Sequence, residues 1–358
     1  MTNRIIGFDL ARAYAIFGMF IVNFNTVFGS HQATSGLGGF LNLFNGNSST
    51  AFVILAGMGV SLMTNRPDYS LLEKSQLRRK VIRRSWFLFA LGLLLYQWWP
   101  ADILHFYGGY MHVAAWLLFA PKRLYLLVAG GAIVGFHGLL PVIPYEAGWN
   151  FNTLEYADFW TVTGFLRNTF YNGWNPLFPW LAFFLLGMWL GRLDWQQRRV
   201  RRWVFGTGAV VLALIEGIQG LVTHHPLGPE VTFYLTADYL PPFLPFMLGT
   251  ASFALVLLVI CLRIGNRFAD HPLLRALSAT GQMTLTHYLL HLTLGIVLFG
   301  GLTGRAYTGA VTEQPPESPA AILLFAVAFY ALSVLLSTVW SRKFRHGPLE
   351  MLMRKATS

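Results

Sequence analysis

Residues 7–31 read GFDLARAYAIFGMFIVNFNTVFGSH. The apolar run in this stretch is about 20 residues long, which as a helix spans the roughly 30 Å hydrocarbon core of a membrane. It nevertheless carries Asp9 and Arg12 near one end and Asn23 and His31 near the other. Because charged and polar side chains are costly inside a membrane, they face the interior of a helical bundle. The stretch therefore predicts a membrane helix with one polar face.

The rest of the chain is apolar from end to end. Of its 358 residues, 55% are hydrophobic and 11% are charged, whereas about a quarter of the residues of an ordinary soluble domain are charged. We therefore expect an all-α fold, a polytopic integral membrane helical bundle of about ten transmembrane helices that forms a single integral membrane domain over residues 1–358. The expected helices cover residues 9–29, 48–63, 85–99, 102–120, 124–144, 177–191, 203–222, 241–262, 279–302 and 320–340.

The placement of positive charge predicts the orientation. Lys and Arg collect in cytoplasmic loops, and every basic residue except Arg12, Arg167 and Arg305 falls on one side of the expected helices. Both termini are then cytoplasmic, and we expect the chain in the bacterial cytoplasmic membrane. The clusters RRKVIRR and QQRRVRR would suit phosphate groups electrostatically, but the same rule accounts for them and for the net charge of +11. No nucleic-acid partner is expected.

Helical geometry brings the polar residues of the first helix onto one face. At about 100° per residue, Asp9 lies about 60° and Asn23 about 20° from Arg12, whereas Asn25 lies near the opposite side. One interpretation is a polar stripe that lines a path across the membrane. The other is structural: Asp9 and Arg12 form an ion pair three residues apart, and Asn23 bonds to a neighbouring helix.

Two further expected helices carry polar stripes. The segment ADILHFYGGYMH, from residue 101, places Asp102 and His105 within about 60° of one another near the outer face. The segment SATGQMTLTHYLLHLTLG, from residue 278, places four side chains on one stripe, namely Thr280, Thr284, His287 and His291. Its HYLLH sequence has the spacing of a zinc helix but lacks the Glu of H-E-x-x-H, so no metal site is expected. A single membrane histidine is typical of a hydrogen bond between helices, and the recurrence of histidines on several helices lowers the weight of that interpretation.

Five motifs, in their order along the chain, resemble the transmembrane acyltransferase superfamily, in its heparan-alpha-glucosaminide N-acetyltransferase-like branch and the related YeiB-like DUF418 proteins. The first two are GFDLARAYAIFGMFIVN and, after a polar loop with a His, FNGNSSTAFVILAGMGVSL. Their Asp-x-x-Arg pattern and Phe-rich segment with Gly correspond to Asp9, Arg12, Phe52 and Gly57. The others are DILHFYG at 102–108, FPWLAFFLLGMWLGR at 178–192 and SATGQMTLTHYLLH at 278–291. The resemblance covers most of the chain.

The resemblance implies a membrane-embedded acyltransferase that moves an acyl group from cytosolic acyl-CoA, with acetyl-CoA as the first candidate, to a hydroxyl or amine acceptor such as a sugar on the opposite side. His31 stands in the loop where the glucosaminide branch has its functional His. We hypothesise that His31 acts as general base or transient acyl carrier, with His105, His291 and Asn23 positioning substrate or stabilising the oxyanion. Arg12, at the cytoplasmic mouth, would meet CoA, and Asp102 would orient a His. The expected catalytic residues are His31, His105 and His291, and the expected substrate-binding residues are Asp9, Arg12, Asn23, Asp102, Thr284 and His287.

Two other functions fit the same polar residues. A transporter or flippase for a small or lipid-linked solute would also need a polar cavity in a helical bundle, whereas a noncatalytic membrane scaffold would need none. The expected partners of the acyltransferase are membrane lipid and a small-molecule or glycan acceptor. The acyl chain, the acceptor and the oligomeric state stay open.

Overall fold

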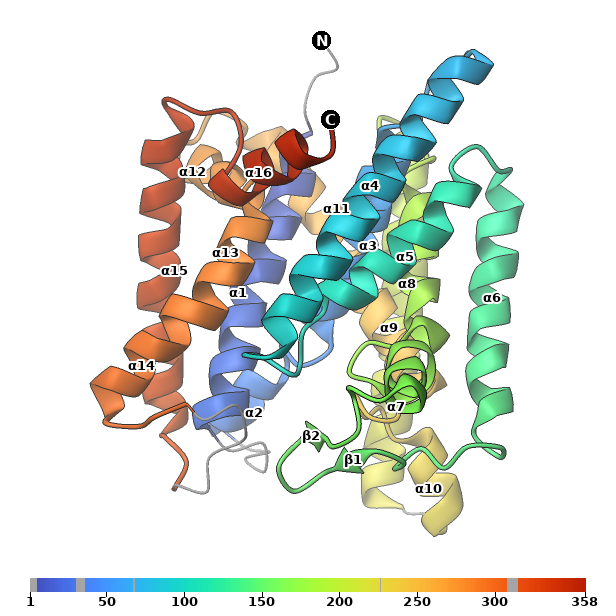
Figure 1. Ribbon diagram of the computed structural model, residues 1–358, viewed down its shortest axis with the longest axis vertical. Helices are drawn as coiled ribbons and strands as arrows, with labels where there is room; N and C mark the ends of the chain where they lie inside the picture. The colour runs from blue at the N-terminus through green and yellow to red at the C-terminus, as the bar shows by residue number, and fades with distance from the viewer. Residues whose placement is uncertain (1–4, 30–35, 67, 226, 308–314) are drawn as a thin grey trace. The chain divides into compact units, whose positions relative to one another are not determined.

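The structure is a computed structural model that describes residues 5–29, 36–66, 68–225, 227–307 and 315–358 (Figure 1). Within these ranges nearly all regular structure is helical, and the sheet found there is a single antiparallel pair of two-residue strands. The helical fold class is therefore confirmed.

The chain divides into two compact units. The first comprises Met1–Phe52 and Trp195–Met351, and the second comprises Val53–Asp194 and Leu352–Ser358, so that α3 (Asn47–Leu62) and α16 (Pro348–Ala356) begin in the first unit and continue into the second. The other elements of the first unit are α1 (Ile6–Phe28), α2 (Gly36–Asn42), α9 (Arg198–His224), α10 (Pro229–Leu235), α11 (Leu244–Arg267), α12 (Pro272–Gly281), α13 (Thr284–Leu290), the π-helix η2 (His291–Gly295), α14 (Ile296–Thr303) and α15 (Pro319–Ser341). Those of the second are α4 (Leu71–Tyr96), α5 (Leu104–Leu117), α6 (Lys122–Leu139), β1 (Trp149–Asn150), β2 (Glu155–Tyr156), α7 (Val162–Arg167), the π-helix η1 (Asn168–Asn172) and α8 (Leu177–Leu190).

Helix α1 forms the core of the first unit. It contacts α11, α12, α13 and α15 (Figure 1). Of its most apolar window, 67% is buried, compared with 17% for α9 and 28% for α15. The sequence GFDLARAYAIFGMFIVN therefore forms a helix that other helices surround, whereas α9 and α15 expose much of their apolar surface.

Five segments are long and apolar enough to cross a membrane by length and composition: Ile6–Phe28, Arg198–His224, Leu244–Arg267, Thr284–Thr303 and Pro319–Ser341. The remaining expected spans also coincide with helices, but α3, α5 and α8 are shorter and α4 is strongly charged over its first half. The chain is thus an integral membrane protein with five such spans within the described residues. The expected count of ten stays a prediction.

Close helix packing in the second unit depends on glycine. A Cβ at Gly57 of α3 would collide with the carbonyl oxygen of Phe184, and one at Gly187 of α8 would collide with that of Ile54. Only residues without a side chain allow the two helices to approach so closely.

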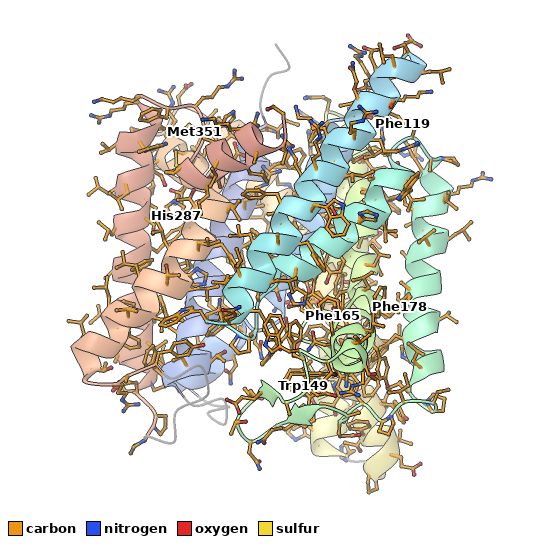
Figure 2. The ribbon with its side chains drawn as sticks, in the orientation of Figure 1. Phe119, Trp149, Phe165, Phe178, His287 and Met351 are labelled. Carbon is orange, nitrogen blue, oxygen red and sulfur yellow. The ribbon has the colours of Figure 1, made fainter. Side chains whose placement is uncertain are left out.

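Further pairs of helices pack together in the second unit. Helix α4 packs against α5, and α6 packs against α8. The strand β1, which carries Trp149 (Figure 2), pairs with β2.

Two helices begin at residues other than the first residue of their expected span. Helix α4 begins at Leu71 instead of residue 85, because Ser70 and Glu73 form a capping box: Ser70 Oγ accepts from the Glu73 backbone N–H, and the Glu73 carboxylate accepts from that of Ser70. Helix α5 begins at Leu104, so Asp102 precedes the helix instead of lying on its face.

The expected helix over residues 279–302 is interrupted. Helix α12 ends at Gly281, α13 begins at Thr284, and the chain widens into η2 at His291. The backbone N–H groups of Leu285 and Thr286 would donate to carbonyls four residues earlier in a continuous helix, but they donate to the Glu350 carboxylate instead, at 2.8 and 3.3 Å. Thr280 therefore does not share one continuous helical stripe with His287 and His291.

Candidate functional site

The first polar contact of the site joins α1 to α12. Asp9 is 1% exposed, and its Oδ1 accepts a hydrogen bond from Arg12 Nη1 at 3.0 Å. Its Oδ2 accepts from Ser278 Oγ at 3.1 Å and from Gln282 Nε2 at 3.4 Å. Gly281 permits this approach, because a Cβ there would collide with the Asp9 carbonyl oxygen. The buried carboxylate is thus compensated by an ion pair and by hydroxyl and amide donors.

The second polar contact joins α1 to η2. Asn23 Nδ2 lies 2.8 Å from Nε2 of His291. The other ring nitrogen of His291, Nδ1, lies 3.0 Å from the backbone carbonyl oxygen of His287. Because a carbonyl oxygen only accepts, Nδ1 carries the proton and the Nε2 lone pair of the neutral ring accepts from the Asn23 amide. These two bonds orient both side chains.

Apolar and hydroxyl groups enclose the two histidines of α13 and η2. The His291 side chain is fully buried, and its ring stacks on that of Phe20 with 4.7 Å between centroids. His291 is the first residue of the π-helix, a local widening that is frequent at functional sites. One turn earlier, His287 (Figure 2) has its Nε2 2.6 Å from Oγ of Ser337 on α15. The structural interpretation of α1 assumed an ion pair between Asp9 and Arg12 and a hydrogen bond from Asn23 to another helix, and both are present. The partner of Asn23 is a histidine.

A third polar pair lies in the second unit. Asp102 Oδ2 accepts from the backbone N–H of His105 at 3.0 Å and lies 3.1 Å from the His105 Nδ1. Both side chains are fully buried. A Cβ at Gly92 of α4 would collide with the His105 backbone nitrogen, so α4 packs directly on this pair. The carboxylate holds the proton on Nδ1, which leaves the lone pair on Nε2 in the neutral ring.

The Nε2 atom of His105 is a buried ring nitrogen in an aromatic environment. It has no hydrogen-bond partner within the described residues. The ring of Phe106 lies 3.8 Å from the imidazole, centroid to centroid, and those of Tyr96 and Phe159 both lie 5.8 Å away. A carboxylate that orients the opposite ring nitrogen is the arrangement that prepares a histidine to take up a proton.

The C-terminal helix supplies the cap of α13. Met283 precedes the helix, and its side chain does not cap it. The Glu350 carboxylate instead accepts hydrogen bonds from Thr286 Oγ1 at 2.6 Å and from the backbone N–H groups of Leu285 and Thr286. The first N–H groups of a helix have no intrahelical partners. A negative charge near them also interacts favourably with the helix dipole. Glu350 thereby sets where the helix bearing His287 begins.

We expect Glu350→Ala to lower the free energy of unfolding by about 1 to 2 kcal/mol, as the loss of a helix cap does. Burial raises the pKa of the Glu350 carboxyl, against the opposing effect of its hydrogen bonds with Thr286. The folded state then binds the proton more tightly than the unfolded state, so stability should fall as pH rises through this raised pKa. Glu350→Gln should remove that dependence. Titration with denaturing detergent across a pH series measures both effects.

The exposed Glu230 on α10 offers a matched control. Glu230→Ala should change the free energy of unfolding by less than about 0.5 kcal/mol. Equal losses in the two variants would show that the carboxylate of Glu350 does not support α13.

The expected site residues separate into three groups. Asp9 and Arg12 pair on α1, Asn23 meets His291, and Asp102 meets His105. The side chain of Thr284 makes no hydrogen bond within the described ranges, and His31 lies outside them.

Sequence reasoning missed four residues. Ser278 and Gln282 bond to Asp9, and Ser337 bonds to His287. Glu350 bonds to the first turn of α13. Ser278 and Gln282 lie within SATGQMTLTHYLLH, where their spacing of four residues places both on one helical face. Ser337 and Glu350 have no comparable local signal.

Two protein families match the chain, and together the matches cover residues 4–358. Residues 187–358 match the family described as "Protein of unknown function (DUF418)". A curated relative, "Uncharacterized protein YxaH" of Bacillus subtilis (strain 168), is 29% identical over 201 residues, which are 52% of this chain and 42% of the relative. The match thus spans less than half the length of that relative. Residues 4–221, more than half of the chain, match the family described as "Heparan-alpha-glucosaminide N-acetyltransferase, catalytic". The chain belongs to this heparan-alpha-glucosaminide N-acetyltransferase catalytic family.

Proposed function

We propose that this protein transfers an acyl group, acetyl in the simplest case, from cytosolic acyl-CoA to an extracytoplasmic hydroxyl or amine acceptor such as a sugar. The family name supports the reaction class. The observation that connects the proposed reaction to particular residues is the hydrogen bond from Asn23 Nδ2 to His291 Nε2 at 2.8 Å.

Acyl transfer requires a base and donors for a developing negative charge. The acceptor oxygen or nitrogen forms a bond to the thioester carbonyl carbon while a base takes its proton, and the C–S bond then breaks to release CoA, whose thiolate takes up a proton. Between these steps the carbonyl oxygen carries negative charge, which pre-oriented N–H donors stabilise. An amide N–H held in a fixed orientation, such as that of Asn23, can serve as one of these donors.

Asn23 fits this task because its amide nitrogen has two N–H bonds. One donates to His291, and the second, which bonds to no other described residue, is proposed to donate to the oxyanion. His291 is then a positioning residue, whose own orientation is set by its bond to the His287 carbonyl and by stacking on Phe20. Thr284 and His287, on the turns that precede His291, are proposed to contact the substrate.

His31 is proposed as the general base or transient acyl carrier, on the strength of its place in the sequence. His105, whose Nε2 is buried, is proposed as a second proton acceptor oriented by Asp102. Arg12, with 23% of its side chain exposed and held by Asp9, is proposed to meet the phosphate or pantetheine of the donor.

The proposed topology is that expected from the sequence. Ten transmembrane helices with both termini in the cytoplasm, in one integral membrane domain of the bacterial cytoplasmic membrane, would place the Asp9 end of α1 inside and the Asn23 end toward the outside. This direction supports transfer from a cytosolic donor to an extracytoplasmic acceptor.

The direct test follows release of the CoA thiol from acetyl-CoA by the purified full-length protein, with glucosamine as the probe acceptor. We expect thiol release by the wild-type protein and a loss of about 100-fold or more in His31→Ala, the range for a general base. Full activity in His31→Ala would remove that residue from the reaction. If the wild-type protein neither releases thiol nor gains thermal stability from acetyl-CoA, the proposed reaction itself is wrong.

A further inference from the structure

Four arginines from two helices of the first unit line one pocket of about 230 Å³. Arg198, Arg201 and Arg202 lie in the first two turns of α9, and Arg263 lies near the end of α11. The positive-inside rule explains why arginines collect on one side of a membrane. Helix α11 packs against α9, which brings Arg263 to the same pocket as three arginines that lie about 60 positions earlier in the chain.

The pocket brings four positive charges together. None of the four guanidinium groups forms an ion pair with a carboxylate in the described part of the chain. Two of them are held in place: Arg201 Nη1 donates to the Trp195 carbonyl at 2.7 Å, and Arg263 lies 5.1 Å above the ring centroid of Phe205. Like charges held together repel, so an anion that binds between them is stabilised.

The N-terminus of α9 adds to the positive electrostatic potential of the pocket. The first turn of the helix contains no acidic residue, and Gln197 provides no side-chain cap. Arginines are unfavourable at this end, because the helix dipole makes it positive, whereas an anion bound there is favoured.

The surroundings point to the chemistry of that anion. Guanidinium groups bind phosphate oxygens in bidentate pairs. Helices α9 and α11 are both long and apolar enough to cross a membrane, and Trp203, beside the pocket arginines in the sequence, is 55% exposed, as is typical of aromatic residues at headgroup level. We propose that Arg198, Arg201, Arg202 and Arg263 form a phosphate-binding site, which takes the phosphate of an anionic lipid headgroup or of a soluble nucleotide. A lipid headgroup at this site goes beyond the proposed acyl transfer, whereas a nucleotide there extends it, because adenosine 3′,5′-bisphosphate is the nucleotide part of CoA. Phosphate binding is measured without that reaction, so each proposal can fail alone.

The test compares two double variants of the full-length protein in uncharged detergent. Arg202→Gln with Arg263→Gln removes two pocket charges and leaves Arg201, which also bonds to the backbone. Arg199→Gln with Arg267→Gln removes the same charge from the same two helices at residues that do not line the pocket. The probes are dioleoylphosphatidylglycerol, dioleoylphosphatidylcholine as its zwitterionic counterpart, and adenosine 3′,5′-bisphosphate, each titrated while the thermal midpoint is followed.

We expect at least one phosphate probe to stabilise the wild-type protein, with an apparent Kd that rises by about tenfold or more in the pocket variant and by less than about threefold in the control. Stabilisation by phosphatidylglycerol alone identifies a lipid headgroup, and stabilisation by the bisphosphate alone identifies a soluble ligand. Equal losses in both variants, or no stabilisation of the wild-type protein by either phosphate probe, would overturn the proposal. If the pocket variant does not fold, Arg202→Lys with Arg263→Lys keeps the charge but removes the bidentate donors, and it should weaken binding as well.

Discussion

Asn23→Ala is expected to lower kcat for acetyl transfer from acetyl-CoA by about 10²- to 10³-fold, the effect of removing one oxyanion donor, while KM changes by less than about threefold. The reason is that the second amide N–H meets full negative charge only in the transition state, so its loss affects the chemical step more than donor binding. The measurement is steady-state release of the CoA thiol by the purified protein.

Asn25 provides the matched control, because it is the same residue type on the same helix and lies nearly opposite to Asn23. Asn25→Ala should retain kcat within about threefold, since a residue away from the reacting groups contributes little to transition-state binding. Thermal midpoints of both variants separate folding from catalysis. Equal losses of kcat in two folded variants would contradict the role given to Asn23.

Asp102→Ala should produce the largest loss of stability among the polar substitutions considered, on the order of 3 kcal/mol. The change removes the acceptor of both the His105 backbone N–H and its Nδ1 proton in a fully buried position. Each buried donor without an acceptor then adds its own desolvation cost. Titration with denaturing detergent measures the free energy of unfolding, and Asp102→Asn, which keeps one acceptor oxygen, should fall between the wild-type protein and Asp102→Ala.

The ion pair between Asp270 and Arg275 is the corresponding control on the surface. The Asp270 side chain is 94% exposed, and pairs of this kind contribute little because water screens them. Asp270→Ala should therefore change the free energy of unfolding by less than about 0.5 kcal/mol. A cost for Asp102→Ala no larger than this would show that the buried pair does not stabilise the second unit.

The helices and the local polar contacts could be predicted from the sequence. Apolar runs of membrane-spanning length gave the positions of α1, α11 and α15 to within a few residues. The ion pair of Asp9 with Arg12 and the proximity of Asp102 to His105 follow from a spacing of three residues, which the local backbone alone brings together. Such contacts need no knowledge of which helices meet.

The remaining contacts depend on tertiary packing. One of the two interpretations of α1 had Asn23 bond to a neighbouring helix, and this contact is present. Its partner His291 lies 268 positions away, and periodicity within each helix does not say which helices pack together. At the break after Gly281, the backbone N–H groups of Leu285 and Thr286 bond to Glu350 on a different helix. The pattern of residues 279–302 alone contains no sign of this contact and predicts a continuous helix. The meeting of Arg263 with the arginines of α9 has the same cause.

The most direct test of the account is a double-mutant cycle on kcat with Asn23→Ala, His291→Ala and the double variant, followed by CoA thiol release. If His291 acts by orienting Asn23, the double variant should be no more than about threefold slower than the slower single variant, because residues that act as a unit are not additive. Losses that multiply in the double variant, or a His291→Ala variant with wild-type kcat, would contradict the claim that this hydrogen-bonded pair forms the centre of the site.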